Sequence, residues 1–334
     1  MLGLIIAGLA VSALIAFSMG ANDLANSIAP LIGSGISRFK QALIVFSIGL
    51  LAGAMAQGYM VIKTLGKGIV SDVDVVGALS ASLAAFIWVM LATVKGIPIS
   101  TTHSITGGVI GIGIAYTLLY GKATSLNLGI VSRIVLSWVT SPPLSIALAA
   151  LLYYLTKRIF SQGDNGRIIP AAVAMAFFVA YSFGANDVAN AVGVYISVTS
   201  KFFGLPDSDA MRLLTAFAVL FICLGGAVAG KRVVETLAYR VTRLDPSTSV
   251  AANADAIAVW LYTTIPFLLF GYGLPISTSY AAVGAIIGAG IAKHKRLRAL
   301  NLRLVLFIMF AWVITVPVTA SLAIAIYTLL SYIL

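Results

Sequence analysis

Charged residues are scarce in this chain of 334 residues: only 9% are charged, whereas 60% are hydrophobic. About one quarter of an ordinary soluble domain is charged, so the composition argues against a soluble enzyme. A helix that spans a bilayer needs roughly 20 apolar residues, and ten such segments occur here, separated by short polar joints. The sequence therefore predicts an all-α polytopic membrane protein with about 10–12 transmembrane segments.

Cysteine is almost absent, because Cys223 is the only one and lies in an apolar run. This excludes disulfides and cysteine-based metal sites. Acidic residues are also few, and the net charge is +11. In a soluble protein that charge would suggest nucleic acid. Here the basic residues lie in the joints between apolar runs, where membrane topology explains them, and we expect no nucleic-acid partner.

The ten hydrophobic segments have approximate edges that can be read from the sequence. Some are longer than one crossing needs, so twelve spans are also compatible with it. The segments are residues 1–35, 41–62, 75–94, 97–120, 127–156, 168–198, 210–230, 250–272, 274–292 and 302–334.

The two halves of the chain repeat each other. Residues 20–26, Gly-Ala-Asn-Asp-Leu-Ala-Asn, return at 184–190 with six identities in seven. Residues 96–103, Gly-Ile-Pro-Ile-Ser-Thr-Thr-His, return at 273–280 with five identities in eight. The order of the motifs is preserved, which indicates an internal duplication of the whole chain.

The duplication predicts two domains, residues 1–160 and 161–334. Because each has five segments, an odd number, the second repeat should enter the membrane inverted relative to the first. With the N-terminus outside, 15 of the 21 basic residues fall in cytoplasmic joints. The positive-inside rule therefore predicts a multi-pass protein of the cell (inner) membrane with both termini outside.

Two aspartates, Asp23 and Asp187, lie well inside apolar segments. A carboxylate at the centre of a membrane helix costs roughly 2.5–3.5 kcal/mol, so it is rarely kept without a partner. One interpretation is a polar cluster that joins helices. We favour a cation site, since carboxylate and amide oxygens suit Na⁺, although a proton is also compatible. Its predicted ligands are Asn22, Asp23, Asn26, Asn186, Asp187 and Asn190, with Na⁺ at the two aspartates.

The residues around these aspartates predict a broken helix at each copy. Gly20 and Gly184 are poor helix residues, and Asn and Asp favour caps and turns. An unwound stretch in a membrane is tolerated where it lines a cavity, and its carbonyl groups would be further cation ligands.

The second motif suits an anion. Pro98 and Pro275 are each followed by Ile and then by small polar residues. Pro favours the first turn of a helix and Ser or Thr its cap, so each string predicts a half-helix that begins inside the membrane. Such helix ends bind oxyanions, unless the hydroxyls only bond to their own backbone. The candidate ligands are Ser100, Thr101, Thr102, Ser277, Thr278 and Ser279.

Other candidates are weaker. His103 is replaced by Tyr280 in the second copy, which disfavours a metal or proton-relay role. Glu235 is interpreted first as a member of an ion pair at a helix end, and Asp255 is a second acid that Lys231 or Arg232 could pair with. The glycine pairs of the two halves, which are Gly107, Gly111, Gly284 and Gly288, predict close approach of helices.

The doubled Gly-Ala-Asn-Asp-x-Ala-Asn and Gly-x-Pro-Ile-Ser-Thr strings resemble the inorganic phosphate transporter (PiT) family of sodium- or proton-coupled phosphate symporters, in its prokaryotic form. The resemblance covers essentially the whole chain. It implies an inverted-repeat transporter, often a dimer, that carries phosphate inward with cations, and its essential aspartates fall on Asp23 and Asp187. One departure is Lys63-Thr64, where the family commonly has an acid as in Glu235-Thr236.

With this resemblance, the sequence predicts a Na⁺-coupled phosphate symporter that works by alternating access. It is not expected to be an enzyme or to need a cofactor other than the co-transported Na⁺. The phosphate would bind at the hydroxyl strings that begin at Ser100 and Ser277. The alternatives are a proton-coupled phosphate or sulfate symporter, an anion channel, and a membrane-embedded hydrolase.

Overall fold

A computed structural model of the chain describes residues 2–61, 70, 73–121, 127–160, 164–204, 206–271, 273 and 276–333. Lys63 and Thr64 lie outside the described residues. The elements, in chain order, are α1 (Leu2–Gly33), α2 (Phe39–Gln57), α4 (Val75–Val94), α5 (Thr101–Tyr120), α6 (Leu128–Ile159), α7 (Asn165–Phe203), α8 (Ser208–Ala229), α9 (Lys231–Tyr239), α10 (Pro246–Ala252), α11 (Asp255–Phe270), α12 (Thr278–His294), the 3-10 turn η1 (Leu297–Ala299) and α13 (Leu302–Ile333).

The helices reproduce the hydrophobic segments of the sequence. In the described ranges, nine stretches are long and apolar enough to span a membrane, with α10 and α11 forming one of them. The tenth predicted segment, residues 274–292, corresponds to α12, which is shorter. The prediction of an all-α multi-pass membrane protein is confirmed.

The helix breaks predicted at the aspartate motifs are wrong. α1 is continuous through residues 20–26, and α7 is continuous through residues 184–190. The glycines have another purpose there. A Cβ on Gly20 would overlap the carbonyl group of Ile222 in α8, and a Cβ on Gly184 would overlap that of Leu50 in α2. Each glycine therefore lets a neighbouring helix cross directly over the motif.

The crossing helices carry glycines at the same places. In α8, a Cβ on Gly225 would meet the carbonyl group of Phe17, and in α2 a Cβ on Gly53 would meet that of Tyr181. The α1–α8 and α7–α2 crossings thus have the same construction, with one helix from each half of the chain. The two halves interlock instead of lying side by side as separate bodies.

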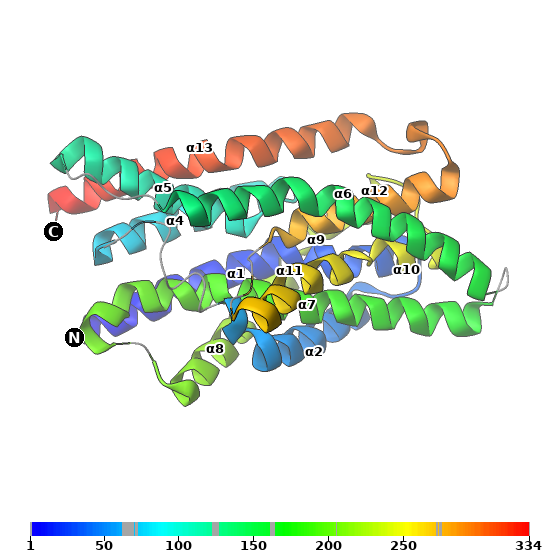
Figure 1. The fold of residues 1–334 in the computed structure, drawn as a ribbon, viewed down its shortest axis with the longest axis horizontal. Coiled ribbons are helices and arrows are strands. Elements are labelled where there is room, and N and C mark those ends of the chain that lie inside the picture. Colours follow the sequence, from blue (N-terminus) through cyan, green and yellow to red (C-terminus); the bar gives the residue numbers. More distant parts are fainter. Residues whose placement is uncertain are drawn as a thin grey trace.

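Two helical hairpins approach the motif helices from opposite ends of the molecule. At the base of the first, the Asp74 N–H before α4 donates to the Tyr116 hydroxyl of α5 at 2.8 Å. At the base of the second, Lys293 of α12 pairs with Asp245 before α10 at 2.9 Å. The first hairpin opens to the left and the second to the right, and both chain termini lie at the left (Figure 1).

The tips of the hairpins are the true interruptions of the membrane helices. The first tip joins α4 to α5 through residues 95–100, where Gly96 has a φ of 69°. The second joins α11 to α12 through residues 271–277, and Pro275 lies outside the described residues. The predicted helix starts after the Pro-Ile-Ser strings are confirmed, at Thr101 and Thr278.

The paired glycines seat the hairpins against two long helices. Gly107 and Gly111 of α5 lie against the backbone of α13, and Gly284 and Gly288 of α12 lie against the backbone of α6. The close helix approach predicted for these pairs is confirmed. Both contacts run along helices that contain a proline, Pro317 in α13 and Pro142-Pro143 in α6.

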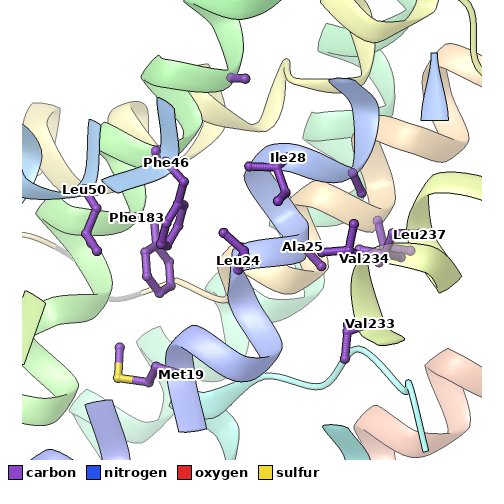
Figure 2. Packing of buried hydrophobic residues seen from close by; sticks show 14 of the residues in the cluster. Met19, Leu24, Ala25, Ile28, Phe46, Leu50, Phe183, Val233, Val234 and Leu237 are labelled. Carbon is purple, nitrogen blue, oxygen red and sulfur yellow. The ribbon is translucent and has the colours of Figure 1, made fainter. Parts of the chain in front are cut away.

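The apolar core surrounds the middle of α1. Leu24, Ala25 and Ile28 project from α1 between two groups of side chains (Figure 2). Phe46, Leu50 and Phe183 lie on one side, and α9 supplies Val233, Val234 and Leu237 on the other. This packing fixes the position of the residues that follow Gly20 along the helix.

The glycine crossings can be tested with a pair of substitutions in one helix. Gly184→Ala adds a methyl group against the α2 backbone, and overpacking of this kind costs about 1–3 kcal/mol. We expect a lower midpoint of thermal unfolding in detergent. Gly193→Ala is the matched control, because no atom lies within 4 Å of the added Cβ and alanine favours a helix. Equal midpoints for the two variants would contradict the packing role.

Candidate functional site

Asp23 and Asp187 lie in the interior of the protein, beside the tips of the two hairpins. Each lies near the middle of an unbroken helix, α1 or α7, and their exposed fractions are only 1% and 2%. Neither forms an ion pair with a basic side chain in the described part of the chain. Two buried carboxylates without a basic partner need a cation or a proton to be stable there.

Asn22 clamps the first hairpin tip to α1. Its side-chain oxygen accepts from the Ile99 N–H at 3.0 Å. Its amide group donates to the Ile97 carbonyl at 3.1 Å and to the Thr93 hydroxyl at 2.9 Å. These bonds satisfy backbone groups that the turn leaves without helix partners. The tip is therefore tied to the residue that precedes Asp23.

Asn186 makes the same clamp on the second tip. Its oxygen accepts from the Ile276 N–H at 3.3 Å and from the Thr263 hydroxyl at 3.2 Å, and its amide donates to the Ile276 carbonyl at 3.1 Å. Sequence reasoning placed Asn22 and Asn186 among the cation ligands. In this structure, both amides hold the tips, and their role as ligands stays a prediction.

Asp23 contacts both tips. The Thr101 hydroxyl at the start of α5 donates to one carboxylate oxygen at 2.7 Å. The Ser279 hydroxyl at the start of α12 donates to the other at 2.7 Å. Ser279 also receives a bond from the Asn26 amide at 3.3 Å. One carboxylate thus joins α1 to the N-termini of helices from both halves.

Asp187, in the second half of the chain, contacts the hairpin tip of the first half. The Thr102 hydroxyl of the first tip donates to it at 3.3 Å, and the Asn190 amide donates to Thr102 at 3.1 Å. Thr278 begins α12 at the second tip and is buried. Adjacent residues, Thr101 and Thr102, therefore reach the two different aspartates, which places both carboxylates next to one tip.

Two of the six predicted hydroxyls act as helix caps. The Ser100 hydroxyl accepts from the His103 N–H, and the Ser277 hydroxyl accepts from the Tyr280 N–H. These two bonds are local, as the alternative interpretation of the hydroxyl strings predicts for any single residue. The caps leave Thr101, Thr102, Thr278 and Ser279 on the first turns of α5 and α12. The positive ends of two helix dipoles thus converge beside the carboxylates.

One predicted cation ligand has an oxygen without a partner in the described chain. The Asn26 side-chain oxygen is buried and has no hydrogen-bond partner among the described residues. Its amide group lies 3.4 Å from an Asp23 oxygen. An unsatisfied buried acceptor next to a carboxylate is of the oxygen type that hard cations prefer.

A stack of four rings lies behind the tips. His103 stacks on Trp138, with ring centroids 3.4 Å apart, and lies tilted against its counterpart Tyr280, with centroids 4.3 Å apart. Tyr280 stacks in turn on Trp312 at 3.7 Å. Within the described residues, no group of three His, Cys, Asp or Glu is placed to hold a metal ion. His103 is therefore part of an aromatic contact between the two hairpins.

Glu235 and Asp255 have different surroundings. Glu235 lies 3.9 Å from Lys231 on the exposed face of α9, so the ion pair at a helix end is confirmed. Asp255 is completely buried and pairs with neither Lys231 nor Arg232, so that expectation is wrong. Arg232 instead donates to the Val94 carbonyl at 2.6 Å.

Asp255 is a candidate that sequence reasoning missed. It begins α11, directly after the break between α10 and α11. Its carboxylate has no side-chain hydrogen bond or ion pair in the described chain and faces only the backbone N–H groups of Asp255 and Ala256. The side-chain oxygens of Asn253 and Ser249 also lack partners among the described residues. The signal in the sequence is an acid two residues after an asparagine inside a hydrophobic segment, a weaker form of the pattern at Asp23.

The fold and the site define a multi-pass membrane protein whose buried carboxylates meet two helix N-termini. A family model described as "Phosphate transporter family" matches residues 19–173 and 168–323. The chain therefore belongs to the phosphate transporter family, as the resemblance of its motifs predicted. The family model matches twice in succession along the chain, which agrees with the duplication.

Curated relatives and a solved structure extend this match. A protein named "Putative phosphate permease" from Thermococcus kodakarensis is 30% identical over 402 residues, covering 94% of this chain and 95% of the relative. One of the same name from Haemophilus influenzae is 28% identical, covering 94% of each. A solved structure named "The sodium-dependent phosphate transporter" has a TM-score of 0.85 and 27% identity, covering 99% of this chain and 100% of that one.

The two tryptophans of the ring stack provide a matched test of the first tip. The Trp312 ring N–H donates to the Pro98 carbonyl at 3.1 Å, whereas the Trp138 ring N–H is buried without a partner in the described residues. Trp312→Phe should lower the free energy of unfolding by about 1 kcal/mol more than Trp138→Phe, because the substitution of Trp312 removes a hydrogen bond and that of Trp138 does not. Thermal unfolding in detergent measures both. A larger loss for Trp138→Phe would contradict the assignment.

Proposed function

We propose that this phosphate transporter is a secondary active symporter that imports inorganic phosphate together with Na⁺ by alternating access. The observation that carries the proposal is the pair of buried carboxylates, Asp23 and Asp187, which lack basic partners among the described residues and touch helix N-termini of both hairpins. The sodium dependence in the name of the similar solved structure supports the choice of Na⁺.

The cation site consists of the two carboxylates and the amides one turn after them. Asp23 with Asn26, and Asp187 with Asn190, each supply carboxylate and amide oxygens from one helix face. Oxygen ligands suit a hard cation such as Na⁺. A bound cation also offsets the charge that makes each aspartate costly in the membrane.

The phosphate site consists of the first turns of α5 and α12. Backbone N–H groups and hydroxyls point out of both helix ends, and helix N-termini bind oxyanions. The hydroxyls of Thr101, Thr102, Thr278 and Ser279 lie there, with the caps Ser100 and Ser277 behind them. Two carboxylates without cations would repel a phosphate dianion, so cations bind first or together with it.

The hydroxyl groups couple the two ligands. A hydroxyl has one hydrogen to donate. The Thr101 hydroxyl is directed to Asp23, and the Ser279 hydroxyl has two acceptors within reach, Asp23 at 2.7 Å and the Ile99 carbonyl at 3.0 Å. Na⁺ at Asp23 occupies the carboxylate and attracts the hydroxyl oxygens, which releases the hydrogens to a phosphate oxygen. Phosphate affinity therefore rises when the cation is bound, as binding linkage requires.

The hairpins supply the alternating gates. They open toward opposite ends of the molecule (Figure 1), as expected if residues 1–160 and 161–334 are inverted repeats. Each tip contacts both sides of the site, so withdrawing one tip opens the site to one end while the other keeps it closed. An inward Na⁺ flow supplies roughly 2.3 kcal/mol per net charge per 100 mV.

The membrane setting follows the sequence-based expectations. Both termini lie at the same end of the molecule (Figure 1), and the bias of basic residues in the sequence favours an orientation with that end outside the cell. A homodimer is proposed from the family resemblance alone. The cycle moves phosphate without breaking a bond in it, so no enzymatic activity is proposed.

Phosphate is preferred over sulfate for a chemical reason. HPO₄²⁻ retains a proton to donate and SO₄²⁻ does not, so an acceptor such as an aspartate can distinguish them. In the cation-bound site, a carboxylate oxygen that does not coordinate Na⁺ accepts a hydrogen bond from this phosphate O–H group. A sulfate oxygen at the same place would face the carboxylate without a hydrogen between them.

Uptake of labelled phosphate into proteoliposomes with an inward Na⁺ gradient tests the proposal. The double variant Asp23→Asn/Asp187→Asn should lose uptake by at least about 100-fold, because a buried cation loses both charged ligands. Asp209→Asn is the control, since this aspartate is exposed in α8. Unchanged uptake in the double variant would contradict the cation site.

The same vesicles distinguish the alternatives. Uptake driven equally well by a proton gradient without Na⁺ would indicate proton coupling. Competition by sulfate as strong as by phosphate would contradict the selectivity. A conductance that persists without phosphate or a cation gradient would indicate an anion channel.

We also propose that Asp255 holds a further cation of the same cycle. Its carboxylate is completely buried and has no basic or other side-chain partner among the described residues, and Asn253 and Ser249, whose side-chain oxygens also lack partners there, precede it at the α10–α11 break. The corresponding arm of the first hairpin, α4, has no such break. This cation would therefore bind to the second hairpin alone.

Asp255→Asn tests this separately from the central site. It should raise the Na⁺ concentration for half-maximal uptake by about tenfold or more and reduce the steepness of the Na⁺ dependence. Ser145→Ala is the control, because Ser145 is a buried hydroxyl of α6 that also has no partner in the described part but has no acid nearby in the sequence. An unaltered Na⁺ dependence in Asp255→Asn would contradict the additional cation.

A further inference from the structure

A basic pocket lies at the base of the second hairpin, away from the transport site. It has a volume of about 610 Å³. Its walls come from the segment before α10 and the turn between α12 and α13. It is lined by Arg243, Lys293, His294, Arg296, Arg298 and Ala299.

The walls of the basic pocket are fastened to each other. The Asn301 N–H donates to the Val241 carbonyl at 2.9 Å, and the Thr242 hydroxyl donates to the Ala299 carbonyl at 3.3 Å. Lys295, the residue after α12, has a φ of 53°, a left-handed conformation that stops the helix beside the pocket. The basic side chains therefore project from a turn whose backbone is hydrogen-bonded to the segment before α10.

The basic pocket has an excess of positive charge. Lys293 is neutralised by Asp245 at 2.9 Å. Burial alone would raise the pKa of Asp245, but hydrogen bonds from Thr248 and Lys293 outweigh it and lower the pKa, so this carboxylate is charged at neutral pH. The guanidinium groups of Arg243, Arg296 and Arg298 form no ion pair within the described residues. Three guanidinium groups at one hollow are suited to a phosphate group, which they bind with paired N–H donors.

The surroundings of the basic pocket are apolar and lie at the level where the membrane helices end. α12 ends at His294, and α13 begins at Leu302. Leu297, between two of the arginines, is 60% exposed. Exposed side chains then continue from the pocket along one face of α13: Leu302, Leu306, Phe310 and Val313.

We propose that the basic pocket binds the headgroup of an anionic phospholipid, whose acyl chains lie along the exposed face of α13. The positive-inside rule accounts for basic residues in such a turn, but it does not require a hollow or an apolar face that leads away from it. Basic pockets between membrane helices recognise anionic headgroups. A free phosphate would use the arginines but not Leu297 or α13.

A second hollow provides a matched comparison. It measures about 560 Å³ and lies between the α1–α2 turn and α9, with Arg38 and Lys231 in its lining. Glu235 lies in the same lining and pairs with Lys231. Its size is similar to that of the basic pocket, but its charge is more nearly balanced.

The test uses the full chain purified in a neutral detergent. Its thermal unfolding midpoint is measured during titration with phosphatidylglycerol, with phosphatidylcholine and with inorganic phosphate. Phosphatidylglycerol should raise the midpoint of the unsubstituted protein and phosphatidylcholine should not. Arg296→Gln/Arg298→Gln should weaken the phosphatidylglycerol effect by about 30-fold in concentration, since each basic side chain near an anionic lipid contributes roughly fivefold in affinity.

Arg38→Gln/Lys231→Gln is the control and should retain the full lipid effect. Native mass spectrometry should show one phosphatidylglycerol fewer on Arg296→Gln/Arg298→Gln. The proposal is overturned if both double variants respond equally to phosphatidylglycerol. It is also overturned if the two arginines are needed only for the response to inorganic phosphate, which would make the pocket a free-phosphate site. None of these measurements depends on transport, so the result is independent of the proposed symport.

Discussion

Two aspartates that are buried without basic partners among the described residues are the constraint on which the architecture of this protein depends. Asp23 and Asp187 are almost inaccessible, and the described residues offer them hydroxyl and amide hydrogens but no cationic side chain. Hydrogen bonds alone do not repay the transfer of a carboxylate from water. An ionised carboxylate at this place therefore needs a small cation beside it, or a proton on it, and this need underlies the transport cycle proposed above.

The second constraint is that the tips must come close to the carboxylates without unwinding the helices that carry them. Glycines achieve this by letting α8 cross α1 at Gly20 and α2 cross α7 at Gly184. Asn22 and Asn186 then hold the tips by their backbone groups. Since each crossing and each aspartate involves both halves of the chain, neither half forms a complete site.

Sequence reasoning predicted much of the site because the doubled motifs mark chemistry that is rare in a membrane. The two aspartates, the hydroxyl strings and the helix starts at Thr101 and Thr278 follow from residue type alone. The helix break at Gly20 was wrong, because a glycine weakens a helix in isolation but is retained when a neighbouring backbone needs its space. Asp255 was missed because its pairing depends on which face of α11 is buried, and that is a property of the packing.

The sequence by itself determined the class of protein, the ten hydrophobic segments, the duplication and the residue types of the site. These depend on hydrophobicity and on local helix chemistry, which neighbouring residues along the chain decide. Only the tertiary structure decided that Thr101 and Thr102 reach different aspartates, that Ser279 crosses to Asp23, and that three arginines surround a hollow. Such contacts join residues separated by up to 256 positions, and the close packing of whole helices selects them.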